Sequence, residues 1–262
     1  MLLIVIICVF AVFPFIWMLM ISLKTRIQTY DPSVWFFMPT LDNYKEIVNE
    51  KHVLEYVKNS AVVVILTTIL SMAFGSFAAY GFARYNFKRR ESLAFWILSL
   101  RMIPAMAAVI PFFIMARMVN ILDTNLVLII SYLLFNIPFT IWMMRGFFED
   151  IPKEIEESAL VDGSSRLEVF TKILIPLATP GLVATAIFCI INSWNELVFA
   201  LFLTSVDART LPTTVTLFLS VTGVLWGDMA AVGVVTALPV LIFAMFVQKY
   251  MIRGLTFGAV KQ

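Results

Sequence analysis

The sequence is short of charge. Charged residues make up 14% of its 262 residues, whereas apolar residues make up 61%. Ordinary soluble domains contain about 25% charged and about 45–50% apolar residues. Several unbroken apolar runs are also too long for an ordinary buried helix, so a soluble all-α protein is disfavoured. The formal net charge is only +2, and no basic cluster indicates a nucleic-acid partner.

Residues that perform chemistry are also scarce. His52 is the only histidine and lies in a polar segment without a second ligand nearby, so neither a metal site nor a proton relay is expected. Cys8 and Cys189 lie in separate apolar tracts and form neither a disulfide framework nor a zinc spacing. The chain contains no G-x-x-x-x-G-K-[ST] phosphate loop, so we expect it not to bind ATP in the usual way. We predict no catalytic residues and no metal, which disfavours a membrane-bound enzyme.

Six apolar tracts dominate the chain, and each is long enough to cross a bilayer. They are Leu2–Leu23, Ser60–Ala83, Ser92–Met118, Leu126–Met144, Ile175–Leu203 and Met229–Met251. In lipid every backbone polar group must be paired within its own segment, so each tract is predicted to be a helix. The fold class is therefore an all-α integral membrane protein with about six transmembrane helices, in a single domain over residues 1–262. The first tract lacks a basic leader and a cleavage site, so we expect a true span rather than a signal peptide.

Lysine and arginine in the connecting segments predict the orientation. The two ends and the even-numbered connections carry about eleven of them, against about six on the opposite side. The richer side contains Arg84, Lys88, Arg89, Arg90, Arg145, Lys153, Arg166, Lys172, Lys249, Arg253 and Lys261. Because basic loops stay in the cytoplasm, both termini are expected there.

The connection Arg145–Ile173 is expected to form two short amphipathic helices and a turn. Asp150 is predicted to cap the first helix, with Pro152 in its opening turn. Ile151, Ile155 and Ala159 recur at four-residue spacing and form a narrow apolar stripe.

The end of the first helix and the start of the second carry recognisable caps. Gly163 suits the left-handed conformation at a helix C-terminus. Ser165, followed three residues later by Glu168, predicts a capping box. On this chemistry alone, the segment is either a compact knob or an amphipathic linker on the lipid surface.

The residues of this loop carry a specific resemblance. The segment from Glu157 to Gly163, with Phe170, Pro176 and Pro180 after it, closely resembles the E-A-A-x-x-x-G loop of ABC importer permeases. Serine replaces the usual alanine at Ser158, which is a mild departure. Other stretches resemble the carbohydrate branch of maltose-permease type: Pro14, Trp17, Ser22–Lys24, Arg101–Pro104, Pro111, Trp194–Glu196 and Arg253–Lys261. The resemblance covers nearly the whole chain.

The resemblance implies a type I importer permease in the cytoplasmic (inner) membrane, which carries a sugar or polyol. In that family the 150–172 loop is a coupling helix that inserts into the ATPase subunit, so the implied coupling residues are Glu157, Ser158, Ala159, Asp162 and Gly163. The implied partners are a second homologous permease, two ATP-binding-cassette subunits that hold ATP and Mg, an extracytoplasmic solute-binding protein and membrane lipid. A different solute class is the first alternative to a sugar. An ion-coupled secondary transporter is the second, although it would require paired intramembrane acids.

Polar residues at membrane depth are the candidates for the substrate path, since they are costly there and usually face protein or water. Arg101 could line the pathway, pair with a partner subunit or extend to the membrane surface. Asn192, Asn195 and Glu196 flank Trp194, and this mixture of hydrogen-bonding groups and an aromatic ring suits a sugar. Helix–helix hydrogen bonding or contact with an external receptor is the alternative role for these residues.

Overall fold

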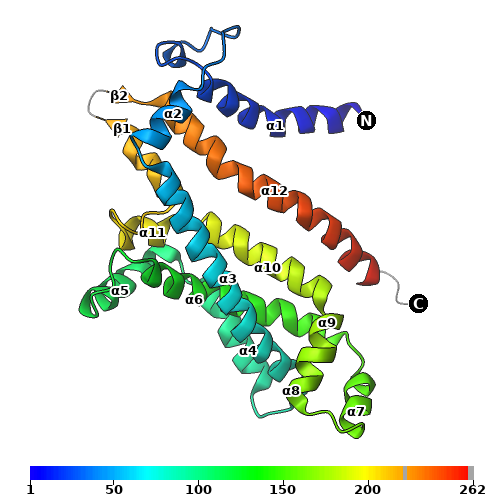
Figure 1. Ribbon diagram of the computed structural model, residues 1–262. Helices are drawn as coiled ribbons and strands as arrows, with labels where there is room; N and C mark the ends of the chain where they lie inside the picture. Colours follow the sequence, from blue (N-terminus) through cyan, green and yellow to red (C-terminus); the bar gives the residue numbers. More distant parts are fainter. Residues whose placement is uncertain (221–222, 259–262) are drawn as a thin grey trace. The chain divides into compact units, whose positions relative to one another are not determined.

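The computed structural model describes residues 1–220 and 223–258, and nearly all of this chain is helical (Figure 1). The chain folds into two compact units. The first unit contains Met1–Ser60 and Ala208–Ile242, and the second contains Ala61–Asp207 and the chain from Phe243 on. Two of the helices, α3 (Val53–Arg84) and α12 (Trp226–Gly258), run from one unit into the other.

The first unit contains one complete long helix and several short elements. Its elements are α1 (Leu2–Ser22), η1 (Gln28–Tyr30), α2 (Asp42–Asn49), η4 (Leu211–Phe218) and the antiparallel pair β1 (Leu219–Ser220) and β2 (Gly223–Val224). The buried amide of Asn43 ties α2 to the end of α1, because its Nδ2 donates to the carbonyl oxygens of Ser22 and Lys24, both at 2.8 Å. The ammonium of Lys24 lies over the rings of Trp17 and Phe37, at 5.7 and 5.5 Å from their centres.

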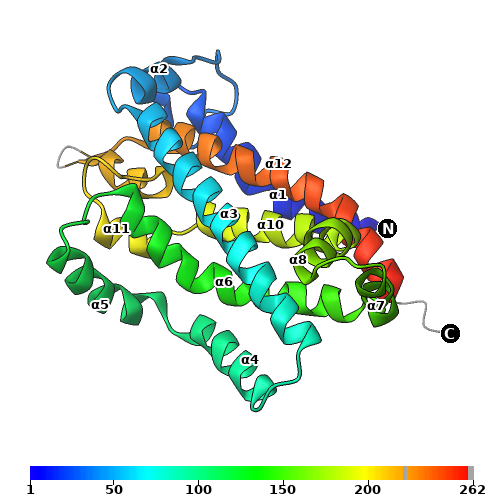
Figure 2. The same cartoon turned by 60° about the horizontal axis from the view of Figure 1, so that its bottom comes forward.

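The second unit is built around α6 (Asn125–Glu149), against which α10 (Thr179–Trp194) and α11 (Val198–Leu203) pack (Figure 2). One buried cluster surrounds Leu128, Tyr132 and Phe199. The other surrounds Met144 and Phe148 and includes residues of α3. Gly75 of α3 brings that helix against Thr140 of α6, since a Cβ at Gly75 would lie 2.6 Å from the Thr140 Cβ.

Four of the six predicted spans are confirmed as single helices. Within the described residues, α1, α3, α6 and α12 are each long and apolar enough to cross a bilayer. The count rises to six if two bent helix pairs are each taken as one span. The prediction of about six spans therefore agrees with the structure. Helix α12 continues to Gly258, so the last residues of the tail motif, Ala259–Lys261, lie outside the described residues.

The prediction of one helix over Ser92–Met118 is wrong. This tract forms α4 (Arg90–Ser99), η2 (Leu100–Met102) and α5 (Ala105–Met118), and the chain bends by 91° between them. The cause is Pro104, which has no N–H and disfavours helical backbone at the residue before it. Ile103 accordingly has an extended backbone, with φ −67° and ψ 122°.

The prediction of one helix over Ile175–Leu203 is also wrong. The chain enters through α8 (Arg166–Glu168), the π-helical η3 (Val169–Leu174) and α9 (Ile175–Leu177), and then bends by 79° into α10. A second interruption separates the end of α10 at Trp194 from the start of α11 at Val198. Both interrupted tracts belong to the second unit.

Because α3 lies close to α6, substitution of two glycines of α3 by alanine should affect stability differently. Gly75→Ala should place a Cβ against Thr140 and cost about 1–3 kcal/mol through overpacking. Gly81→Ala is the matched control, because a Cβ there meets nothing within 4 Å. Thermal unfolding of the detergent-solubilised protein should show a lower Tm for the first variant only. Equal Tm values would contradict this packing.

Candidate functional site

A helical knob follows α6 and is built from α7 (Lys153–Val161), a turn and α8 (Figure 1). The predicted cap at Asp150 is wrong. Asp150 instead ends α6, since its N–H donates to the Gly146 oxygen at 3.1 Å. Pro152 occupies the N-cap position of α7, and its extended ψ of 135° delays the helix until Lys153.

The predicted caps on either side of the turn are confirmed. Gly163 has a φ of +91°, which only glycine adopts without strain. The N–H of Ser164 donates to the Ala159 oxygen at 3.0 Å and the N–H of Gly163 to the Leu160 oxygen at 3.1 Å, which is a Schellman motif. Ser165 and Glu168 form the predicted capping box. Local hydrogen bonds therefore set the shape of the knob.

Apolar packing holds the knob against the rest of the second unit. Phe170 is buried between Tyr80 of α3 and Phe148 of α6, with ring centres 5.2 and 6.0 Å away. Of the predicted apolar stripe, Ile151 and Ala159 pack against this cluster, whereas Ile155 is 40% exposed. The expectation of a compact knob is therefore confirmed.

A buried ion pair that the sequence did not lead us to expect links the knob to α3. Glu156 is only 6% exposed and pairs with the Nε of Arg84. Tyr80 donates its hydroxyl to the other carboxylate oxygen at 3.3 Å. Arg84 also donates to the Ile151 oxygen at 2.9 Å. A signal was present, because Glu156, Ala159 and Leu160 share one helical face, as do Tyr80 and Arg84.

The predicted coupling residues lie mostly on the outside of the knob. Glu157, Ser158, Asp162 and Gly163 are exposed, and Ala159 is half-buried. The hydroxyl of Ser158 donates to the Glu154 oxygen of the preceding turn at 2.7 Å. The loop thus presents the residues of the E-A-A-x-x-x-G segment on an accessible surface, while Glu156 anchors the opposite face.

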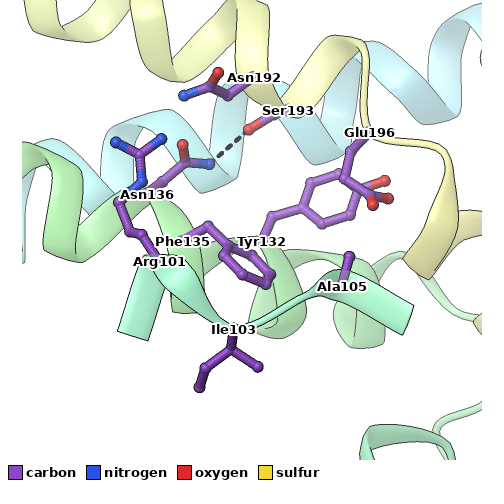
Figure 3. A pocket seen from close by; sticks show the side chains of 9 residues that line it. All are labelled: Arg101, Ile103, Ala105, Tyr132, Phe135, Asn136, Asn192, Ser193 and Glu196. Atoms are coloured by element: carbon purple, nitrogen blue, oxygen red, sulfur yellow. Dashed lines mark hydrogen bonds between the residues drawn. The ribbon is translucent and has the colours of Figure 1, made fainter. Parts of the chain in front are cut away.

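A cavity of about 300 Å³ lies in the second unit where both interrupted tracts meet α6 (Figure 3). It is lined by Arg101, Ile103, Ala105, Tyr132, Phe135, Asn136, Asn192, Ser193 and Glu196. The structure thus brings together three of the four predicted path residues, namely Arg101, Asn192 and Glu196. Asn195 is not among the lining residues, since its amide donates to the Ile191 oxygen at 2.9 Å.

Glu196 binds backbone groups at the start of α11. Its carboxylate accepts the backbone N–H groups of Val198 at 3.0 Å, Phe199 at 3.1 Å and Ala200 at 3.3 Å. The hydroxyl of Tyr132 is a further hydrogen-bond partner of this carboxylate. The group therefore satisfies the first N–H groups of a helix that begins inside the protein.

At the end of the cavity away from Glu196, the polar side chains have fewer hydrogen-bond partners. The Nδ2 of Asn136 donates to the Ser193 hydroxyl at 2.8 Å, whereas its buried Oδ1 has no hydrogen-bond partner. The guanidinium carbon of Arg101 lies 4.7 Å from the centre of the Phe139 ring. Figure 3 shows Arg101, Asn136 and Asn192 grouped at this end, away from Tyr132 and Glu196. Hydrogen-bonding groups beside aromatic faces suit a ligand rich in hydroxyl groups.

Potential metal ligands are dispersed in the structure. The described residues contain no group of three or more histidine, cysteine, aspartate or glutamate side chains that could hold a metal ion. Cys8 is exposed and Cys189 is buried, and both are free thiols.

Comparison with known proteins identifies the family. The sequence model of the family described as binding-protein-dependent transport system inner membrane component matches residues 71–257. The chain is 34% identical to the trehalose/maltose transport system permease protein MalG of Thermococcus litoralis, over 98% of this chain and 94% of that protein. It is 34% identical to the diacetylchitobiose uptake system permease protein DasC of Streptomyces coelicolor, over 95% and 92% of the two chains.

A solved structure shows the same fold. A chain of a bacterial ABC transporter involved in the import of the acidic polysaccharide alginate superposes with a TM-score of 0.79 and 25% identity, over 95% of this chain and 94% of that one. The protein therefore belongs to the family of binding-protein-dependent transport system inner membrane components. It is an integral membrane permease with the fold of a type I ABC importer, and the resemblance of its loop to ABC permeases is confirmed.

The buried pair between Arg84 and Glu156 predicts a stability effect. Glu156→Gln leaves the Arg84 guanidinium buried without a counter-charge and should cost about 3 kcal/mol. The double variant Arg84→Gln/Glu156→Gln should recover part of this loss, because no uncompensated charge remains.

Glu154→Gln is the matched control on the same helix, since that side chain is exposed. Thermal unfolding in detergent measures all four proteins. Equal Tm values for Glu156→Gln and Glu154→Gln would show that the ion pair does not stabilise the knob.

Proposed function

We propose that this chain is one permease subunit of an ATP-driven importer for a sugar or polyol, and that it forms part of the translocation path. The observation that carries this proposal is the similarity, over nearly the whole chain, to permeases named for trehalose/maltose and diacetylchitobiose. The cavity supports it independently, because hydrogen-bonding side chains and aromatic rings converge there.

The subunit works with four kinds of partner. A second homologous permease completes the path, two ATPase subunits bind ATP and Mg, and an extracytoplasmic binding protein delivers the solute. Lipid surrounds the apolar helices in the cytoplasmic membrane, and both termini lie on the cytoplasmic side with the knob. A solved complex of the alginate ABC transporter with its periplasmic protein has the same fold, with a TM-score of 0.68.

The knob couples this subunit to its ATPase through the exposed residues Glu157, Ser158, Asp162 and Gly163, with Ala159 beneath them. Contacts then lead from the knob to the cavity. Glu156 binds Arg84 of α3, and Gly75 of the same helix lies against Thr140 of α6. The hydroxyl of Thr140 in turn donates to the backbone carbonyl oxygen of Asn136 at 2.9 Å.

ATP binding acts through these contacts by favouring one of two helix packings. Nucleotide-bound and nucleotide-free ATPases make different contacts with the knob, and this difference shifts the balance between inward-facing and outward-facing bundles. An ion-coupled transporter would need free acids at membrane depth. Glu196 does not fit that role, because it is bound to the backbone of α11.

Reconstitution tests the proposed function. The chain, its co-purified ATPases and second permease, and the binding protein would be placed in proteoliposomes with radiolabelled maltose or trehalose outside. ATP inside the vesicles should drive uptake of at least one of these sugars. A chain that purifies alone and shows uptake driven only by an ion gradient would refute the proposal.

The turn of the knob gives a specific prediction. A Cβ at Gly163 meets nothing within 4 Å, so Gly163→Ala acts through its φ of +91° alone. That strain costs about 1–2 kcal/mol and disfavours this shape of the turn, so the substrate-stimulated ATPase rate should fall. Gly146→Ala is the matched control, because it also meets nothing within 4 Å but lies inside α6. Both variants should insert normally in the membrane, and undiminished stimulation in Gly163→Ala would argue against a coupling role.

A further inference from the structure

Arg101 is a cation without a counter-ion at the cavity. In the described part of the chain no carboxylate pairs with it, whereas Arg84, Arg90 and Arg145 each have one. Its guanidinium lies over the Phe139 ring, and the side chain is exposed. A charged group at membrane depth is costly, and such groups usually pair or serve a ligand.

The carboxylate in the same cavity is already bound. Glu196 accepts three backbone N–H groups of α11 and lies with Tyr132 at the end opposite Arg101 (Figure 3). It therefore does not neutralise Arg101. The two ends of the cavity therefore differ in charge.

One further feature at that end suits a ligand. The Oδ1 of Asn136 is a buried acceptor without a partner, in a residue that is 2% exposed and lines the cavity. A buried acceptor of this kind favours a ligand that donates a hydroxyl.

We propose that this cavity selects a sugar that carries a carboxylate. Arg101 binds the carboxylate, and Asn136 with Asn192 binds hydroxyl groups of the ring. Tyr132 and Phe135 provide the apolar walls. The inference rests on the proposed function, because it names the charge of the sugar that the importer carries.

Two matched sugars test whether the cavity prefers a ligand with a carboxylate. Methyl β-D-glucuronide and methyl β-D-glucoside differ only at C6, where the first has a carboxylate. Each would be titrated calorimetrically into the complete transporter in lipid nanodiscs, without its binding protein. The glucuronide should bind about tenfold more tightly or better, as expected for one charge-assisted hydrogen-bonded contact.

Variants test whether the cavity causes the difference in affinity between the two probes. Arg101→Gln should abolish the preference for glucuronide, and Asn192→Ala should weaken both probes to the same extent. Arg117→Gln is the control, because this arginine lies near the end of α5 and does not line the cavity. It should keep the full preference.

Four outcomes would overturn the inference: equal affinity for the two probes, no binding of either probe, loss of preference in Arg117→Gln, or loss of the second permease from the complex in Arg101→Gln. The last result would mean that Arg101 pairs with the partner subunit. Co-purification of the ATPases and the second permease with the unaltered chain is measured separately. If that complex is intact, these outcomes refute the acidic-sugar site and leave the proposed function standing.

Discussion

A helix in lipid must pair all of its backbone polar groups, and most features of this structure follow from that requirement. Within its apolar tracts the described chain interrupts its helices at three places, and two of them lie at the cavity. At the first, Pro104 contributes no N–H to be satisfied. At the second, the carboxylate of Glu196 accepts the N–H groups that open α11. Such interruptions are tolerated where they face protein or a cavity, and both of these line the same one.

The cavity and the knob depend on the same packed helices. Helix α6 supplies three cavity residues and ends where the knob begins. Helix α3 lies against α6 at Gly75 and binds the knob through Arg84. Because packed helices rearrange between discrete positions rather than deforming continuously, the proposed coupling would act through contacts that are already formed.

The sequence predicted those features that depend on neighbouring residues. The caps at Gly163 and Ser165 were predictable because each needs only four or five consecutive residues. The breaks were not, since proline alone does not reveal them. Pro111 and Pro138 lie inside continuous helices, whereas Pro104 ends one. A proline in a tract long enough to span a membrane is therefore ambiguous until the surrounding contacts are known.

The sequence by itself determined that this is a helical membrane protein, where its apolar tracts lie and which loop resembles the E-A-A-x-x-x-G segment. Length, apolar composition and short spacings are local properties, and each has one physical interpretation in a bilayer. Only the tertiary structure decided that Glu156 faces Arg84 from 72 residues away, that Asn195 does not line the cavity, and that Glu196 caps a helix. These depend on which helix faces which, because pairing between distant side chains is decided by packing and leaves no local pattern in the chain.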